Sequence, residues 1–185
     1  FDNGMLISNY LIYCNTINLN YFWQRKILLC EIKKYNILPS MQPSHCTSDM
    51  NWLPDRIGNH RLKLISRWKT FIDQGLKIPG GSDCPIETGN PLFEFYAAVT
   101  RQDHTGWPKE GWQSQEKINS NQALNMFTKW AAYGGFQENS RGKIKIGYDA
   151  DLAIIDMKKK FKISNKWIQS KSKWTPSVSY THLTL

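Results

Sequence analysis

Residues 37–45 read Ile-Leu-Pro-Ser-Met-Gln-Pro-Ser-His, a short apolar run that is closed by a proline and followed at once by a histidine. The run from Ile37 to Gln42 is typical of a short strand, because Pro43 cannot donate to a sheet and bounds it. In an α/β barrel the chemistry lies at the carboxyl ends of the strands, where the loops that leave them converge over the barrel mouth. His45 therefore occupies a position at which that architecture places functional side chains.

A second segment of the same kind lies further along the chain. Residues 76–81 form a short apolar run that continues as Ser82-Asp83. Between the two runs, residues 57–75 carry apolar side chains at a spacing of three and four, which predicts one amphipathic helix that ends at Gly75. Strands that alternate with helices indicate parallel pairing, so His45 and Asp83 are expected to leave neighbouring strands at the same edge.

The next part of the chain predicts two more helices around a loop. Residues 92–99 have helical spacing, and a Gly-containing loop with Trp107 and Trp112 follows them. This loop is either a lid over the barrel mouth or a segment whose tryptophans pack against the rim. Asn119 and Gln122 form a capping-box pattern, which predicts a helix that ends at the next Gly-Gly pair.

A strand pair is predicted after the last of these helices. Lysine and isoleucine alternate over residues 143–146, and a turn leads from there to the apolar run 152–155. Alternation predicts a half-exposed strand and a continuous apolar run predicts a buried one.

Composition and charge exclude several classes of protein. The chain has 185 residues, of which 41% are hydrophobic, and a mean hydropathy of −0.52, which indicates a globular domain and not a helical membrane protein. The net charge is +9, and residues 141–185 hold ten lysines and arginines against three aspartates. Lysines without interleaved arginines usually form a solvated surface, so a nucleic-acid partner is not favoured.

The N-terminal stretch and the cysteines indicate in which cell compartment the protein is expected. The apolar stretch from Met5 to Trp23 is interrupted by four asparagines, so it fits neither a signal peptide nor a membrane span. Four cysteines without close spacing fit a reducing compartment. We therefore expect a cytoplasmic location, without a membrane partner. The chain begins with Phe1, which favours a truncated sequence.

Several motifs, taken together, resemble a known family. They are similar to the amidohydrolase superfamily, and within it to the YtcJ-like branch, amidohydrolase family 3. The resemblance runs in one consistent order over residues 31–157 and rests on five stretches: Met41–His45, Gly81–Pro85, Asn90–Leu92, Ala97–Arg101 and Gly142–Leu152. A lone histidine or aspartate carries little weight, whereas an ordered series of motifs is specific.

The resemblance implies an α/β fold class: a partial TIM (β/α) barrel, comprising its C-terminal strands and helices, plus strands of a small β-sandwich domain. Residues 1–30 match nothing in this pattern. Residues 31–140 would form the C-terminal part of the barrel, residues 141–157 the sandwich strands, and residues 158–185 a basic tail. A complete barrel needs ~250 residues, so the chain would supply only its last strands and helices.

The resemblance also implies a metal-dependent hydrolase of non-peptide C–N bonds, with a small amide-type substrate and zinc as the expected divalent metal. His45 and Asp83 would be both metal ligands and catalytic residues. Asp83 would accept a proton from the attacking water and pass it to the leaving nitrogen, and His45 would bind the metal or polarise the carbonyl oxygen. Gln42, Arg61 and Arg101 are the candidates for substrate contacts.

Alternative interpretations remain for these residues and for the whole chain. Asp83 could be a turn residue that bonds its own backbone, and His45 a histidine of a surface loop. The family supplies a His-x-His pair and a further histidine, but this sequence has no histidine before His45, so we expect the chain to be inactive. The rival hypotheses are a non-catalytic basic interaction module of residues 141–173 and a fragment without function.

Overall fold

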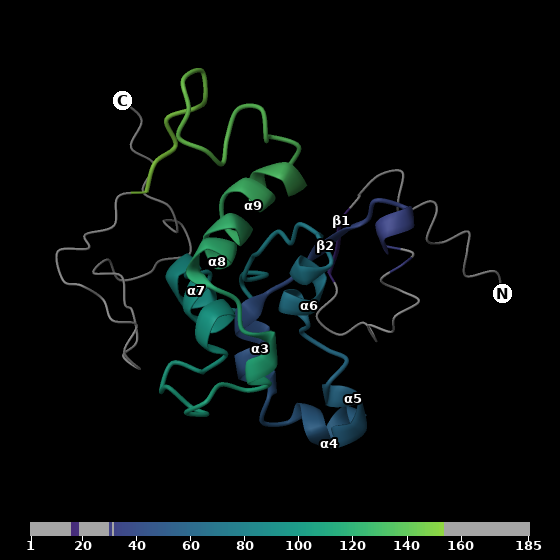
Figure 1. Ribbon diagram of the computed structural model, residues 1–185. Helices are drawn as coiled ribbons and strands as arrows, with labels where there is room; N and C mark the ends of the chain where they lie inside the picture. The colour runs from purple at the N-terminus through teal and green to yellow at the C-terminus, as the bar shows by residue number, and fades with distance from the viewer. Residues whose placement is uncertain (1–15, 19–29, 31, 154–185) are drawn as a thin grey trace.

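The computed structural model describes residues 16–18, 30 and 32–153, and Figure 1 shows their arrangement. Strands β1 (Thr16–Asn18) and β2 (Leu38–Ser40) pair in parallel, with Thr16 opposite Leu38 and Asn18 opposite Ser40. The predicted strand at residues 37–42 is thus confirmed over its central part. No helix among the described residues is long and apolar enough to cross a membrane.

The second predicted strand is present only as a bridge. Met41 forms an isolated parallel bridge with Gly80, in which Met41 N–H donates to the Pro79 carbonyl at 3.1 Å and Gly81 N–H donates to the Met41 carbonyl at 3.2 Å. Residues 76–79 are not in a strand. The prediction of a full strand was therefore wrong in length, but the predicted parallel direction is confirmed.

The single helix predicted over residues 57–75 is wrong, because the chain turns twice within it. The structure has three short helices, α4 (Leu53–Ile57), α5 (Asn59–Leu62) and α6 (Trp68–Asp73). Gly58 has a φ of 78° and Ser66 has a φ of 49°, and neither value fits an α-helix.

Helix α6 ends as the sequence predicts. The Gly75 N–H donates to the Ile72 carbonyl at 2.8 Å and the Leu76 N–H donates to the Phe71 carbonyl at 3.1 Å, which is the pair of bonds of a Schellman motif. Gly75 has the positive φ, 82°, that this motif requires.

The later helices α7 and α8 begin at side-chain caps, of which the cap of α8 was predicted from the sequence. Helix α7 (Pro91–Thr100) starts after Asn90, whose side chain accepts the Leu92 N–H. Helix α8 (Ser120–Met126) starts with the predicted capping box of Asn119 and Gln122. One helix was expected to run on from there, but the chain breaks at Thr128 and continues as α9 (Lys129–Gly134). A short 3₁₀ helix, η1 (Ser114–Glu116), precedes α8.

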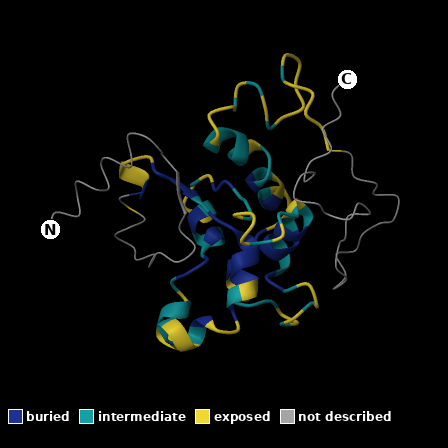
Figure 2. Cartoon of the chain, turned by 180° about the vertical axis from the view of Figure 1, so that it is seen from behind, coloured by how far each residue is buried: buried dark blue, intermediate teal, exposed yellow. Residues whose placement is uncertain are grey.

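The core lies where α6, α7 and α8 face the paired strand segments. In Figure 1, α7, α8 and α9 lie next to one another, and α4 and α5 lie apart at the lower edge. Figure 2 shows buried residues concentrated in the middle of the molecule. The largest fully buried apolar side chains are Trp68, Phe71, Ile32, Met41, Ile78 and Met126. The strand ends at Met41 and Gly80 are thereby held by the core itself.

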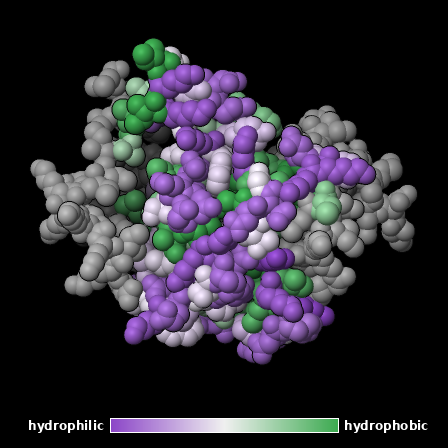
Figure 3. All heavy atoms as spheres, in the orientation of Figure 1, coloured by the Kyte–Doolittle hydropathy of each residue, from purple (hydrophilic) through white to green (hydrophobic). Residues whose placement is uncertain are grey.

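Residues 141–153 form no strand, so the strand pair predicted there is wrong for the part that the structure describes. Ile144 and Ile146 are 93% and 101% exposed. A strand pair needs further strands or a covering helix for stability, and alternation along one segment cannot supply them. Figure 3 shows apolar side chains at the top of the molecule, where Figure 1 draws this loop.

The partial barrel and the sandwich domain therefore stay predictions. The described residues are mainly helical, with two short parallel strands and one parallel bridge. Of the predicted non-matching segment 1–30, only residues 16–18 and 30 are described, and the basic tail 158–185 lies outside the described residues, as does the end of the predicted strand 152–155.

Candidate metal and catalytic site

His45 lies in the first turn of a helix and not in a surface loop. Helix α3 (Pro43–Asp49) starts directly after the strand segment, and Pro43 begins it because a proline needs no hydrogen-bond acceptor at the first helical position. His45 is 6% exposed and its Nε2 atom is buried. The interpretation of His45 as a surface-loop residue is therefore wrong.

Asp83 lies in an exposed turn. Its φ is 54°, and its carbonyl accepts the Ile86 N–H at 2.9 Å. The alternative interpretation, a turn residue, thus describes its backbone correctly. A turn leaves the carboxylate exposed and able to bind a ligand, so the backbone conformation does not decide between the two roles.

The segment that carries His45 and the segment that carries Asp83 are joined at two places. At their start, Met41 and Gly80 form the parallel bridge, with His45 four residues after Met41 and Asp83 three residues after Gly80. Further on, the Ser48 hydroxyl donates to the Glu87 carboxylate at 2.6 Å, which links α3 to the end of the turn. The two candidate residues therefore leave the same edge of the sheet on segments that stay in contact.

A buried glutamate fixes the first turn of α3. Glu94 of α7 accepts the Ser44 N–H at 2.9 Å through Oε2, and its Oε1 atom is in a short hydrogen bond with the Ser44 hydroxyl. Glu94 is 2% exposed. Burial is the main cause that raises the pKa of its carboxyl to about 7; the charge of Glu87 acts in the same direction, and the two hydrogen bonds from Ser44 oppose the shift. No motif in the sequence marks Glu94; its only signal is that it is an acidic residue within an otherwise apolar helix.

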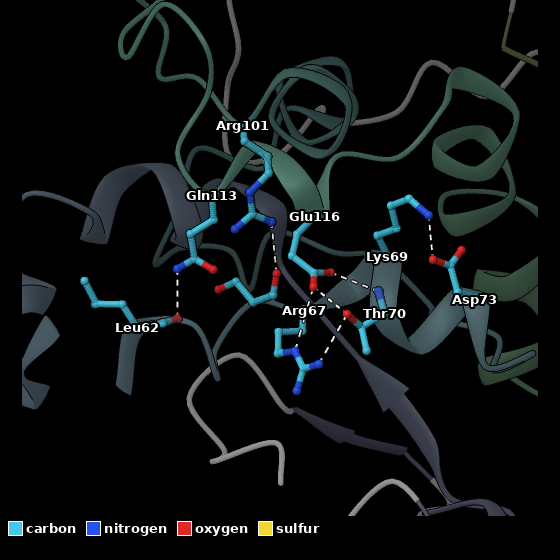
Figure 4. Close-up of polar contacts among 9 residues, drawn as sticks. Leu62, Arg67, Lys69, Thr70, Asp73, Arg101, Gln113 and Glu116 are labelled. Carbon is cyan, nitrogen blue, oxygen red and sulfur yellow. Dashed lines mark hydrogen bonds and ion pairs between the residues drawn. The ribbon is translucent and has the colours of Figure 1, made fainter. Parts of the chain in front are cut away.

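Arg101, a candidate substrate contact, lies inside the core. It is fully buried, and its guanidinium lies 4.0 Å from the centre of the Trp68 ring. Its Nη1 donates to the Ser66 carbonyl at 2.9 Å and its Nε donates to the Trp112 carbonyl, as Figure 4 shows in part. Burial lowers the pKa of the guanidinium, while Cys46 and Glu116 oppose that shift. The contacts shown are structural ones: they hold the two loops that carry Ser66 and Trp112.

The other two candidate substrate contacts lie in different surroundings. Gln42 is 7% exposed and directly precedes α3, although its side chain does not cap that helix. Arg61 lies in α5, in the part of the molecule that Figure 1 shows apart from the strands, and its Nη1 donates to the Ile57 carbonyl at 3.3 Å. Of the three candidates, only Gln42 directly precedes the helix that carries His45.

The tryptophans of the loop before α8 differ in their packing. Trp112 packs against the core, whereas Trp107 is 53% exposed. Trp112 therefore supports the rim interpretation of this loop, and Trp107 leaves the lid interpretation open.

The donor set fits part of a zinc site. An imidazole and a carboxylate are both common zinc ligands, and catalytic zinc usually has three protein ligands. Within the described part of the chain, no three His, Cys, Asp or Glu side chains are grouped so that they could hold a metal ion. His45 and Asp83 can thus furnish two ligands at most.

His45 and Asp83 follow two parallel segments, which is the arrangement expected of α/β proteins whose site lies at the strand ends. Residues 3–181 match the profile of the Amidohydrolase family, and the chain belongs to that family.

Three relatives show how much of such a protein the chain represents. The putative amidohydrolase YtcJ of Bacillus subtilis (strain 168) is 36% identical over 115 residues, which is 62% of this chain and 22% of that protein. Protein LONG AFTER FAR-RED 3 of Arabidopsis thaliana is 26% identical over 153 residues, 80% of this chain and 24% of that protein. The N-substituted formamide deformylase of Arthrobacter pascens is 28% identical over 88 residues, 48% of this chain and 16% of that protein. The chain spans less than a quarter of the length of each relative.

Two crystal structures are similar in fold. Both are of uncharacterized metal-dependent hydrolases, one from Pyrococcus furiosus and one from Pyrococcus horikoshii OT3, with TM-scores of 0.59 and 0.63. Each is 26% identical in sequence, the similarity covers 73% of this chain, and it covers 26% and 27% of the two hydrolases.

Proposed function

We propose that this chain is part of a metal-dependent hydrolase that cleaves non-peptide C–N bonds of small amide-type substrates. The observation that carries the proposal is the double connection between the segments that carry His45 and Asp83, through the Met41–Gly80 bridge and the Ser48–Glu87 hydrogen bond. The family of the chain and the metal-dependent hydrolases of similar fold support it. One relative is named as an N-substituted formamide deformylase, which supports an amide-type bond.

In the proposed mechanism, the residues of the chain bind the metal and move one proton. A bound zinc ion would lower the pKa of a water molecule from roughly 15.7 to about 7 and so supply a nucleophile at neutral pH. Asp83 accepts the proton of the attacking water and delivers it to the leaving nitrogen, which needs an exposed carboxylate with room to reach both atoms. His45 binds the metal through its ring or polarises the carbonyl oxygen.

The activity belongs, in this proposal, to a protein that supplies the remaining ligands. The described residues bring no third ligand to His45 and Asp83, so the 185-residue chain alone is expected to be inactive. The rival proposal, a basic interaction module of residues 141–173, stays a prediction, because residues 154–173 lie outside the described part of the chain.

Zinc affinity tests the proposed site. We expect His45→Ala and Asp83→Asn each to weaken zinc binding by at least ~10-fold, measured by competition with a chromogenic chelator, because each removes a ligand. His60→Ala, a substitution of an exposed histidine of α5, is the matched control and should leave the affinity unchanged. Equal affinities for all variants would refute the site, and amide hydrolysis by the chain alone would refute its predicted inactivity.

A further inference from the structure

Helix α3 has no acceptor of its own for the N–H groups of its first turn. The side chain of its N-cap residue, Gln42, makes no capping hydrogen bond, and Pro43 has no N–H to donate. The Ser44 N–H is therefore the first free donor of the helix. It finds its acceptor on another helix, α7, through Glu94.

The acceptor of this hydrogen bond is a buried side chain. Glu94 lies within the ten-residue helix α7, between the buried residues Phe93 and Tyr96, and α3 packs against α7. Both carboxylate oxygens bond to Ser44, one to the backbone and one to the hydroxyl. Two bonds to one residue fix how the first turn of α3 is rotated about the helix axis and how closely that turn lies to α7. His45 is the next residue in that turn.

A buried glutamate also bonds the first turn of α6, a helix that carries no candidate site residue. Glu116 accepts the Thr70 N–H at 2.9 Å, is in a short hydrogen bond with the Thr70 hydroxyl, and lies 3.7 Å from Arg67 Nε. Figure 4 shows these contacts. The two glutamates are equally well buried, at 2% and 6% exposed. Glu116 is therefore a matched control for the effect of removing such a cap.

We propose that Glu94 is a positioning residue, which holds α3 so that the His45 imidazole keeps its orientation at the strand ends. The proposal rests on the function proposed above, because it assigns a role to Glu94 through His45. A ligand held by a second residue binds its metal more tightly than one that must be ordered on binding. Glu94 does not itself contact metal or substrate in this proposal.

The test measures the accessibility of His45 without any metal. Diethyl pyrocarbonate acylates accessible imidazoles, and mass spectrometry of the full chain after digestion gives a rate for each histidine. The exposed His60 and His104 serve as internal references. The variants are Glu94→Ala, Glu94→Gln and Ser44→Ala, with Glu116→Ala as the matched control, all under conditions in which circular dichroism shows native helix content.

We expect Glu94→Ala to raise the modification rate of His45 by on the order of 10-fold over the wild type, because α3 opens locally more often. Ser44→Ala should give a smaller increase, since it keeps the bond from the backbone N–H. Glu94→Gln should give the smallest, because its amide can accept that N–H and donate to the Ser44 hydroxyl. Glu116→Ala should leave the His45 rate unchanged. If Glu94→Ala does not fold, the other two variants carry the test alone. An unchanged His45 rate in the Glu94 and Ser44 variants, or an equal rise in Glu116→Ala, would overturn the proposal.

Zinc affinity separates this proposal from the proposed function. Glu94→Ala should weaken zinc binding by ~10-fold, as loss of an outer-shell partner does, while Glu116→Ala should not. If His45→Ala leaves zinc affinity unchanged, the proposed function fails, and the modification rates still decide whether Glu94 positions His45.

Discussion

At the scale of single residues, burial decides the chemistry of the acidic groups. Glu94 accepts two hydrogen bonds that would lower the pKa of its carboxyl, but burial dominates and raises that pKa to about 7. The geometry suits both protonation states, because a protonated Oε1 can donate to the Ser44 hydroxyl while Oε2 still accepts the Ser44 N–H. Glu94 can therefore hold α3 on both sides of neutral pH.

The raised pKa predicts a pH dependence of stability. The ordinary pKa of a glutamate is 4.5, so between that pH and about 7 the native chain binds more protons than the unfolded chain. The free energy of unfolding should consequently fall by about 3 kcal/mol as the pH rises through this window. Glu94→Gln removes this contribution. Urea titrations of both proteins at pH 5, 6, 7 and 8 measure it, and parallel pH profiles would contradict the prediction.

At the scale of elements, the sequence predicted where helices begin and end better than whether a long helix is continuous. Both the capping box at Asn119 and the end of α6 at Gly75 are local motifs, in which all partners lie within a few residues. The apolar residues over 57–75 have helical spacing, yet the helix is interrupted at Gly58 and Ser66. Packing of Trp68 and Phe71 into the core decides where α6 begins, and no local pattern shows that.

Two positions require glycine for different reasons: Gly75 for its backbone conformation and Gly80 for the close approach of another side chain. A Cβ at Gly75 would meet no atom within 4 Å, so Gly75→Ala should cost only the positive φ, about 1 kcal/mol of unfolding free energy. A Cβ at Gly80 would lie 2.6 Å from Phe127 Cε1, so Gly80→Ala should cost about 2–3 kcal/mol by displacing the ring. Urea denaturation measures both values. The prediction fails if Gly80→Ala is as mild as Gly75→Ala.

At the scale of the whole molecule, one predicted element lacks its partners. The alternation at residues 143–146 predicted a strand, but the segment lies exposed with Ile144 and Ile146 in solvent. A sheet is stabilised by cross-strand contacts, so a strand pattern becomes a strand only where another segment of the fold lies beside it.

Polar substitution of these isoleucines should hardly change stability. The double variant Ile144→Ser/Ile146→Ser should stay within ~0.5 kcal/mol of the wild type, because neither side chain is buried. Ile78→Ala, in the fully buried core, should lose about 2–5 kcal/mol and serves as the positive control. Chemical denaturation compares the three proteins. A loss above ~1 kcal/mol in the double variant would show that the segment packs against other parts of the chain.

The sequence by itself determined the family and the capping box of α8, because these depend on motifs whose residues are close in the chain. The alternation of strand and helix patterns also predicted the parallel direction of the strand segments. Only the tertiary structure decided that Glu94 bonds Ser44, that Ser48 bonds Glu87 and that Arg101 lies in the core. Each of these contacts joins segments far apart in the chain, and its energy depends on burial, which a linear pattern does not contain.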